Sequence, residues 1–293
     1  MSAQLIDGRG IAGQIRTEVR AEVDRWTAQG HRPPYLAVVL VGDNPASASY
    51  VRGKIRASQE AGIMGDTLAF GADVPESELL ETVSRLGRDK SVDGILVQLP
   101  LPAHIRPDRI IGAVNPDKDV DGLHTINAGR LVTGRAGFLP CTPAGIVELL
   151  TRSDIPTCGQ HTVILGRSNL VGKPLANLML RKGLDATVTV CHSRTRNLKA
   201  LARSADIVVA AIGRACFVTE DMVKPGAAVI DVGINRVEDP SRTRGYRLAG
   251  DVDFEAVRHK AAHLTPVPGG VGPMTIAMLL KNTLLAAQRH TGL

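Results

Sequence analysis

The chain alternates short apolar runs with stretches of helical period. In the first half the apolar runs are "YLAVVLVG", "DTLAF" and "GILVQL", with one helical stretch over 45–61 and another starting near Pro75. In the second half "TVILG", "ATVTVC", "DIVVAAIG" and "AAVIDVG" are separated by segments that begin near Val171, Arg196 and Thr219. Near-continuous apolar strands with helices between them are typical of parallel sheets covered on both faces. The pattern predicts an α/β protein with two sets of strands.

A long segment between the two sets has no clear period. Residues 99–134 are rich in Pro, Gly and Asp, which predicts irregular structure, and loops of this length are usually functional. After it, "FLPCTPAGIVELL" starts a helix, for which we expect Thr142 as N-cap and Pro143 in the first turn. We place a domain boundary there, at residues 140–142.

The last helix, over about 273–288, follows the second set of strands and is expected to pack back on the first domain. The predicted domains are therefore residues 1–140, completed by 273–293, and residues 141–272. In an α/β chain of this pattern, the second set of strands predicts a doubly wound parallel sheet.

Composition narrows the classes of partner. The net charge is +6, yet aromatic residues make up only 3% and no window is a block of Lys and Arg, so nucleic acid is not expected. The basic excess suits small anionic ligands. Four widely spaced cysteines without a C-x-x-C suit a reducing compartment and predict no disulfide frame and no metal site. With no secretory signal pattern and no apolar run of membrane-spanning length, we expect a cytoplasmic protein without a membrane partner.

One strand–turn–helix has the outline of a nucleotide-binding turn. In "HTVILGRSNLVGKPLANLML", Gly166 ends an apolar strand and Gly172 opens a helix, while Ser168 stands near the place of the middle glycine of G-x-G-x-x-G. These glycines alone favour an ordinary turn, since loose glycine patterns are common. A P-loop is excluded because Lys173 is followed by Pro174 and the glycine spacing differs.

The following strand favours a cofactor site. A Rossmann half usually ends its second strand with an acid that binds the adenosine ribose, but "ATVTVCHSRT" has none. Arg167, Ser193 and Arg194 suit a 2′-phosphate through charge-assisted hydrogen bonds, which favours NADP over NAD. Farther on, "IDVGINR" places Gly233 and Ile234 at the end of a strand, on the edge where such sheets bind ligands.

The first domain carries polar residues in apolar surroundings. Tyr50 and Lys54 are four apart on a predicted helix and therefore share a face, although an isolated helical lysine is usually a solvated surface charge. Gln98 lies in an apolar run that a parallel sheet would bury, so its amide needs a partner, and a lysine at the end of the same sheet would serve. Burial would lower the pKa of such a lysine and allow it to carry protons.

"DKDVDG", residues 117–122, begins like a calcium loop. Its twelfth position must supply a bidentate carboxylate, and that position is Ala128, so the calcium interpretation fails. Most such aspartates cap turns, but one of the three could recognise a ligand with paired N–H donors.

Together these segments resemble one family. "YVRGK", "GILVQLPLP", "NPDKDVDGLHTINAGRL", "PCTPAG", "GRSNLVGKP", "DVGINR" and "TPVPGGVGPMT" are similar to the motifs of the bifunctional methylenetetrahydrofolate dehydrogenase/methenyltetrahydrofolate cyclohydrolase enzymes, called FolD in bacteria. They occur in the family's order over nearly the whole chain. The resemblance implies a folate domain, a Rossmann-like NADP domain, a cleft between them and a homodimer.

The resemblance also implies an activity and a set of site residues. The enzyme would oxidise 5,10-methylenetetrahydrofolate with NADP⁺ and hydrolyse the methenyl product to 10-formyltetrahydrofolate. Lys54 would carry the proton of the hydrolysis, Gln98 would tune it, Tyr50 would stack along the folate, and Asp121 would bind the pterin N–H groups. The remaining implied residues are Gly166, Arg167, Ser168, Ser193, Arg194 and Ile234 for NADP, and Pro268, Gly269 and Gly270 for the substrate.

Two alternatives remain open at this level. One is an NADP-dependent dehydrogenase of another small acid, of the shikimate dehydrogenase type, which would not need "PGGVGPMT" or the set Tyr50, Lys54 and Gln98. The other is a protein that binds folate or NADP without catalysis, which the presence of Lys54 disfavours.

Overall fold

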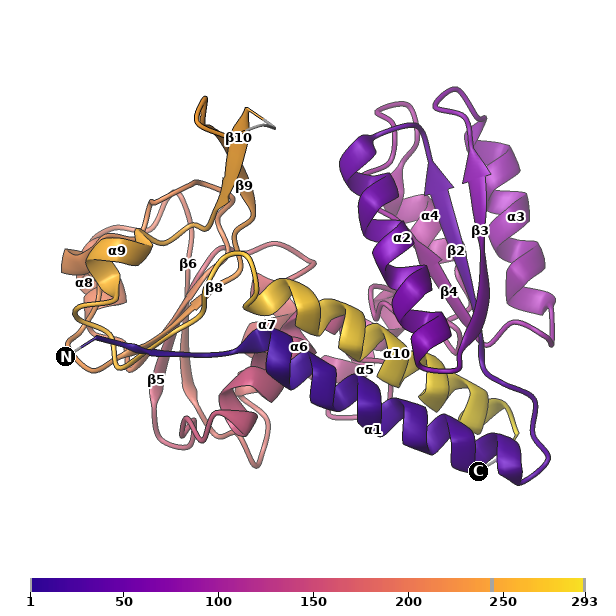
Figure 1. Ribbon diagram of the computed structural model, residues 1–293, viewed down its shortest axis with the longest axis horizontal. Helices are drawn as coiled ribbons and strands as arrows, with labels where there is room; N and C mark the ends of the chain where they lie inside the picture. Colours follow the sequence, from indigo (N-terminus) through magenta and orange to yellow (C-terminus); the bar gives the residue numbers. More distant parts are fainter. Residues whose placement is uncertain (1, 243–244, 292–293) are drawn as a thin grey trace. The chain divides into compact units, whose positions relative to one another are not determined.

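The computed structural model describes residues 2–242 and 245–291, and the chain divides into two units (Figure 1). The six-stranded unit comprises residues 1–12 and 142–275, and the three-stranded unit comprises residues 13–141 and 276–293. Each unit has a parallel sheet and helices, which confirms the predicted α/β class.

The three-stranded unit is built on a sheet of strand order β3-β2-β4. Its strands are β2 (Tyr35–Val41), β3 (Met64–Phe70) and β4 (Gly94–Val97). The central strand β2 pairs in parallel with both neighbours, and Val38 lies opposite Thr67 of β3 and Leu96 of β4. Most of β2 is buried, as its continuous apolar sequence predicts for a strand covered on both faces.

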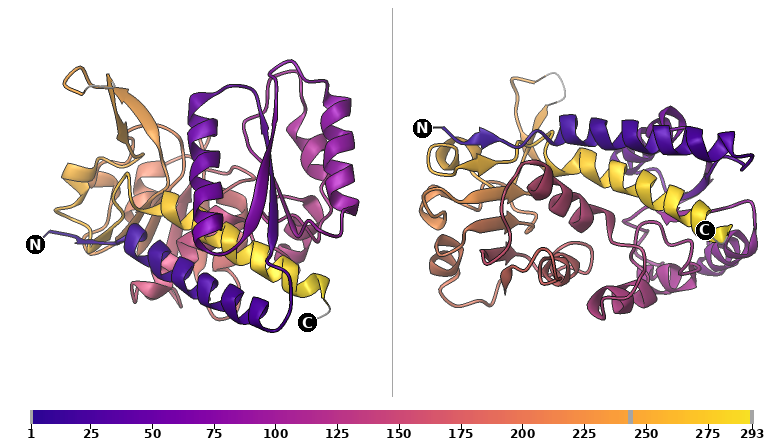
Figure 2. Two further views of the ribbon diagram at one scale, coloured as in Figure 1. Left: turned by 45° about the vertical axis from the view of Figure 1, so that its right-hand side comes forward. Right: turned by 90° about the horizontal axis from the view of Figure 1, so that it is seen from below.

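Helices cover both faces of this sheet. The helices that lie wholly or mostly in this unit are α1 (Gly8–Ala28), α2 (Pro45–Glu60), α3 (Glu76–Arg88), α4 (Pro107–Ala113), α5 (Thr125–Val132) and α10 (Val271–His290). One core joins α3 and α4 to alternate residues of β2, among them Ala37 and Val39, while α2 lies on the other side of the sheet (Figure 1). The helices α1 and α10 run in the same direction, as Figure 2 shows.

The expectation that 99–134 is irregular was wrong, because α4 and α5 lie within it. The residues that suggested irregular structure occupy helix ends instead. Pro107 stands in the first turn of α4, where a missing N–H is tolerated. The side chain of His124 accepts a hydrogen bond from the backbone N–H of Ile126 and caps α5.

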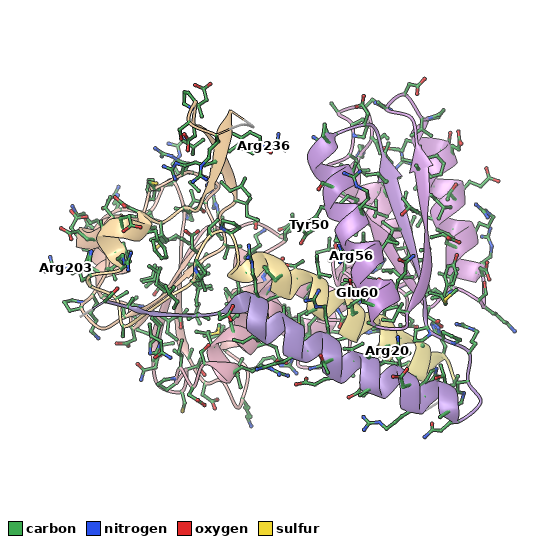
Figure 3. All side chains as sticks on the ribbon, viewed as in Figure 1. Arg20, Tyr50, Arg56, Glu60, Arg203 and Arg236 are labelled. Atoms are coloured by element: carbon green, nitrogen blue, oxygen red, sulfur yellow. The ribbon has the colours of Figure 1, made fainter. Side chains whose placement is uncertain are left out.

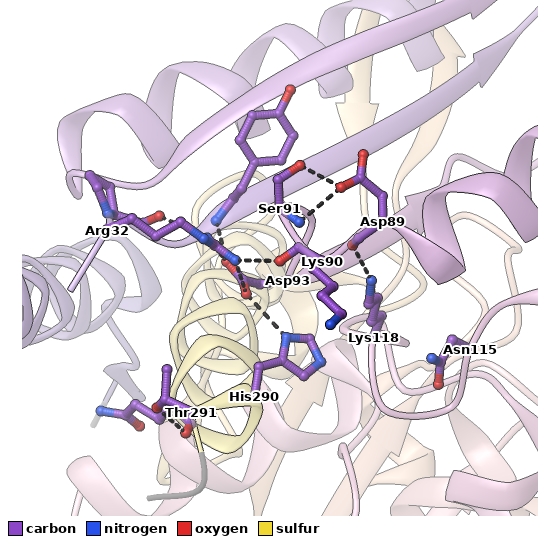
Figure 4. Close-up of polar contacts among 12 residues, drawn as sticks. Arg32, Asp89, Lys90, Ser91, Asp93, Asn115, Lys118, His290 and Thr291 are labelled. Atoms are coloured by element: carbon purple, nitrogen blue, oxygen red, sulfur yellow. Dashed lines mark hydrogen bonds and ion pairs between the residues drawn. The ribbon is translucent and has the colours of Figure 1, made fainter.

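A buried carboxylate anchors the end of α10 to this unit (Figure 4). Asp93 accepts two hydrogen bonds from Arg32, at 2.6 and 2.9 Å, and one from the backbone N–H of Tyr35 at 2.8 Å. Nδ1 of His290, the last residue of α10, lies 3.1 Å from the same carboxylate. The last helix is thereby tied to the start of the central strand and to the residue before β4.

The six-stranded unit has strand order β1-β11-β8-β7-β5-β6, and every neighbouring pair is parallel. The chain moves from β5 to β6 on one side and then to β7 on the other, so the strand order reverses at β5, as in a doubly wound sheet. The strands are β1 (Gln4–Leu5), β5 (His161–Leu165), β6 (Thr187–Cys191), β7 (Ile207–Ala210), β8 (Ala228–Asp231) and β11 (His263–Leu264).

Short helices and one hairpin complete this unit. The helices are α6 (Cys141–Arg152), α7 (Gly172–Met179), α8 (Leu198–Arg203), the 3₁₀ helix η1 (Glu220–Met222) and α9 (Phe254–Val257). The antiparallel hairpin consists of β9 (Asn235–Glu238) and β10 (Tyr246–Ala249). Because α6 begins at Cys141, Thr142 lies inside its first turn and is not the N-cap that we expected. The Thr142 hydroxyl instead pairs with the hydroxyl of Thr275 at 3.0 Å.

Three further observations bear on partners. Within the described residues, no helix is both long and apolar enough to cross a membrane. That same part of the chain contains no group of three or more His, Cys, Asp or Glu side chains placed to hold a metal ion. All four cysteines are free: Cys141 and Cys191 are buried, and Cys158 and Cys216 are exposed.

Candidate active site

Lys54 is a buried lysine held by neighbouring polar groups. It lies on α2 with only 4% of its surface exposed, and its Nζ donates a hydrogen bond of 3.0 Å to Oε1 of Gln98. Tyr50, one turn earlier on the same face, projects from α2 (Figure 3), and its ring centroid is 4.7 Å from the ammonium. The predicted contact between Gln98 and a lysine is therefore present.

Gln98 itself lies just beyond β4, which ends at Val97, and it is half-buried. The expectation that it lies inside the buried strand was wrong, because only four residues of this apolar run pair as a strand. Its Nε2 donates a hydrogen bond of 2.6 Å to the carbonyl of Leu99, which turns Oε1 toward Lys54. The amide thus has a fixed orientation at the carboxyl end of the sheet.

Burial sets the ionisation of Lys54. The pKa of Lys54 is lowered because the apolar surroundings disfavour the ammonium form. The negative charge of Asp121 opposes this lowering, so Asp121 lies within electrostatic reach of the amine. An amine in this setting gives up its proton more readily than a surface lysine does.

The three aspartates of "DKDVDG" have separate surroundings. Asp117 pairs with Arg130 at 3.1 Å. Asp119 is buried and accepts hydrogen bonds from the backbone N–H groups of Leu123 and His124 and from the amide of Asn127, while burial raises the pKa of Asp119 to about 6.

Asp121 is the half-buried member of the three and the one near Lys54. Its position depends on close backbone packing: Gly122 has φ +72°, and a Cβ there would lie 2.5 Å from the carbonyl carbon of Leu139. From α10, Nδ2 of Asn282 donates to the carbonyl of Val120 at 2.8 Å and to that of Leu139 at 3.0 Å. One amide therefore fastens the residue before Asp121 to the segment before α6.

A cavity of about 380 Å³ lies at the carboxyl edge of the six-stranded sheet, where the strand order reverses. The turns after β5, β6 and β7 form its walls, and the polar and glycine residues among them are Gly166, Arg167, Ser168, His192, Ser193 and Arg214. Gly166 has φ +124°, and a Cβ there would lie 2.2 Å from the carbonyl oxygen of Ala211, so only glycine fits this turn.

The cavity holds four of the six residues expected to bind NADP: Gly166, Arg167, Ser168 and Ser193. Arg194 and Ile234 are not among the described residues that line it. The described residues of the lining include cationic and hydroxyl groups and no carboxylate, which fits a phosphorylated dinucleotide.

Sequence reasoning missed His192, Arg214 and Phe217, which also line this cavity. The guanidinium carbon of Arg214 lies 4.9 Å from the ring centroid of Phe217. His192 follows β6 directly, and Arg214 and Phe217 lie in the segment after β7, so all three come after strands that flank the point of reversal, where doubly wound sheets bind ligands.

Pro268, Gly269 and Gly270, which we expected to approach the substrate, lie just before α10 in the six-stranded unit. Tyr50 and Lys54 lie in the three-stranded unit. Gly269 has φ +117°, and the N–H of Gly270 donates to the carbonyl of Pro266 at 2.8 Å. Pro268 and these two glycines form a tight turn that ends where α10 begins.

A doubly wound sheet with a glycine turn and a cationic cavity, together with a second α/β unit that carries a buried lysine, defines a two-unit enzyme of the dinucleotide-dependent class. More specifically, the chain belongs to the tetrahydrofolate dehydrogenase/cyclohydrolase family. The model of the family's catalytic domain matches residues 6–121, and that of its NAD(P)-binding domain matches residues 140–291.

Relatives match over nearly the full length. The bifunctional protein FolD of Salinibacter ruber is 59% identical over 286 residues, which cover 98% of this chain and 96% of the relative. The crystal structure of the bifunctional FolD enzyme of Campylobacter jejuni is 45% identical with a TM-score of 0.93, and the alignment covers 98% of this chain and 99% of that one. The Trypanosoma brucei enzyme, solved with NADP and an inhibitor, is 41% identical with a TM-score of 0.94 and 99% coverage of both chains.

Proposed function

We propose that this protein oxidises 5,10-methylenetetrahydrofolate with NADP⁺ and then hydrolyses 5,10-methenyltetrahydrofolate to 10-formyltetrahydrofolate. The observation that carries the proposal is the buried Lys54, which lies within the region that matches the family's catalytic domain. Its amine donates a hydrogen bond to Gln98 and lies over the ring of Tyr50. Family membership favours this activity over the oxidation of another small acid.

The hydrolysis needs a group that moves protons near the one-carbon bridge. Water adds to the cationic methenyl carbon and loses a proton, the bond from that carbon to one folate nitrogen breaks, and that nitrogen gains a proton. A neutral Lys54 accepts the proton from water and delivers it to the departing nitrogen. Burial already lowers the pKa of Lys54, and the positive charge of the substrate lowers it further by repulsion.

The other polar groups of the three-stranded unit position the folate and the lysine. Tyr50 stacks along the folate, and Asp121 accepts hydrogen bonds from the amino and ring N–H groups of the pterin. Gln98 holds the amine of Lys54 in one orientation through its 3.0 Å hydrogen bond. The turn of Pro268, Gly269 and Gly270 offers backbone without side-chain bulk to the substrate.

The cofactor is NADP, and the residues that we assign to its binding belong to the six-stranded unit. Arg167 and Ser193 line the cavity and suit the 2′-phosphate, and Arg194 follows in the same turn. Gly166 and Ser168 shape the turn after β5, where Oγ of Ser168 accepts a hydrogen bond of 3.1 Å from the N–H of Val171. Ile234 is assigned to the cofactor by its place after β8. When bound, NADP⁺ supplies the acceptor for a hydride, so these residues act by binding and orienting.

Two assignments at the level of the whole protein also belong to the proposal. Folate is assigned to residues 1–140 with 273–293, and NADP to residues 141–272. We infer a cytoplasmic homodimer from the family resemblance, and sedimentation equilibrium of the pure protein tests the dimer.

A two-product assay tests the function. The protein is given 5,10-methylenetetrahydrofolate with NADP⁺ and, separately, with NAD⁺, and reduced cofactor and 10-formyltetrahydrofolate are measured independently. We expect both products with NADP⁺. Reduced cofactor without the formyl product contradicts the assigned role of Lys54, and binding of both ligands without turnover supports a protein that binds without catalysis.

A further inference from the structure

Two buried carboxylates of the six-stranded unit take no part in the chemistry proposed above. Asp231 is the last residue of β8, in "DVGINR", and Asp251 follows β10, in "AGDVD". Asp231 is 4% exposed and Asp251 is fully buried. Neither forms an ion pair with any of the residues 2–242 and 245–291. A buried carboxylate without a cation persists only where hydrogen bonds replace its hydration, so the donors around these two groups show what the carboxylates organise.

Asp251 accepts hydrogen bonds from three consecutive backbone N–H groups. Its Oδ2 accepts from Ile212 at 2.6 Å and Gly213 at 2.9 Å, and its Oδ1 accepts from Arg214 at 2.9 Å. Nδ2 of Asn235, the first residue of β9, also donates to Oδ1 at 2.9 Å. One side chain therefore fixes the whole turn after β7.

Asp231 in turn fixes the backbone that carries Asp251. Its Oδ1 accepts from the N–H of Asp251 at 2.8 Å and from that of Gly233 at 3.0 Å, and its Oδ2 accepts from Val252 at 3.0 Å. A Cβ at Gly233 would lie 2.2 Å from Oδ1 of Asp251, and one at Gly250 would lie 1.8 Å from Oδ2 of Asp231. The glycines of both motifs are required so that the carboxylates can approach the backbone.

The turn that Asp251 holds is a wall of the cofactor cavity. Ile212 and Arg214 line that cavity, and Gly213 between them has φ +73°. Three adjacent N–H groups that point at one carboxylate leave the backbone of the turn little conformational freedom, so the point from which the Arg214 side chain leaves the turn is fixed.

We propose that Asp251 is a positioning residue for NADP, which acts by fixing residues 212–214 so that Arg214 meets a phosphate of the bound cofactor. Asp231 supports this positioning indirectly, because it accepts a hydrogen bond from the backbone N–H of Asp251. This inference rests on the proposed function and adds Arg214 to the cofactor contacts and Asp251 to the groups that support them.

The first test changes the turn and leaves the carboxylates in place. Gly213→Ala puts a side chain at a positive φ where it meets no other atom, so its effect is conformational. Gly226→Ala is the matched control, because Gly226 has φ +82° and equally open surroundings but lies before β8, at the opposite edge of the same sheet. The dissociation constant of NADP⁺ is measured by titration calorimetry for both variants and for the wild type.

We expect Gly213→Ala to raise the dissociation constant of NADP⁺ by about five- to thirtyfold and Gly226→Ala to leave it within about twofold. Equal dissociation constants for Gly213→Ala and the wild type overturn the inference. A wild-type protein that does not bind NADP⁺ overturns the proposed function, and this inference falls with it.

The second test separates positioning from general stability. In Asp251→Asn the new NH₂ group faces N–H donors, so the turn loses at least one of its paired contacts. We expect the KM for NADP⁺ to rise by about tenfold or more. The kcat at saturating NADP⁺ and the affinity for 5,10-methylenetetrahydrofolate are expected to stay near the wild-type values. Parallel losses in NADP⁺ affinity, folate affinity and kcat indicate a structural role and contradict positioning. If Asp251→Asn does not fold, the comparison of Gly213→Ala with Gly226→Ala tests the inference by itself.

Discussion

At the scale of single residues, the central feature is an amine whose protonation is controlled by its surroundings. Burial lowers the pKa of Lys54, and the contact of 3.0 Å with Gln98 satisfies the amine without adding a negative charge. A neutral amide therefore holds Lys54 while favouring the ammonium form less than a carboxylate would. This explains why glutamine, and not glutamate, suits position 98.

Gln98→Glu tests this electrostatic argument. A carboxylate beside the amine favours the ammonium form and raises the pKa of Lys54. Because the proposed hydrolysis uses the neutral amine, the acid side of the pH–rate profile is expected to move to higher pH by about one unit or more. The profile is measured from the disappearance of 5,10-methenyltetrahydrofolate. An acid limb at the wild-type pH contradicts the role given to this pair.

Arg167 carries a separate prediction about cofactor choice. If it binds the 2′-phosphate, Arg167→Gln raises the KM for NADP⁺ by about ten- to hundredfold and changes that for NAD⁺ by less than about threefold. Arg203→Gln is the control, because Arg203 is an exposed arginine on α8 of the same unit (Figure 3). Equal effects of Arg167→Gln on the two cofactors would assign Arg167 to a part of the site that NADP and NAD share.

At the scale of elements, apolar runs identified most of the parallel strands. The strands β2, β5, β7 and β8 coincide with predicted runs because they are buried in parallel sheets, and the partly exposed edge strand β6 also coincides with a predicted run. Pairing in the sheet, and not the local pattern, defines the two-residue strands β1 and β11, so neither was predicted. The helices α4 and α5 were missed because their cap residues were interpreted as breaks in regular structure.

The side chain of Asn282 links the last helix to the segment that carries Asp121, which we assigned to the proposed folate site. Asn282 of α10 bonds the carbonyls of Val120 and Leu139 and so supports Asp121. Asn282→Ala leaves both carbonyls without this donor and is expected to raise the KM for the folate substrate by about tenfold. The dissociation constant of NADP⁺ is expected to be unchanged. Gln288→Ala, on the same helix, is the control, and an equal effect of both variants on the folate KM rules out a specific support of Asp121.

At the scale of the whole molecule, the sequence was sufficient for the family and the fold class, and partly sufficient for the site. Tyr50, Lys54 and Gln98 were predicted as neighbours because helical spacing and the need of a buried amide for a partner both operate over short distances. Arg214 and Asp251 could not be predicted in the same way. The turn that contains Arg214 and the Asp251 carboxylate that accepts hydrogen bonds from its N–H groups are 37 to 39 positions apart in sequence, and only the folded sheet edge brings them together.

The proposed function assigns the two reactions to different groups: Lys54 serves the hydrolysis, whereas binding and orientation serve the hydride transfer. The most direct measurement is therefore the two-product assay on Lys54→Met, with Arg56→Met, an exposed cation on the same helix (Figure 3), as the control. We predict that Lys54→Met still reduces NADP⁺ at a measurable rate, while enzymatic formation of 10-formyltetrahydrofolate falls by at least about a hundredfold and the methenyl compound accumulates. Equal loss of both activities in Lys54→Met, with Arg56→Met unaffected, would contradict this division.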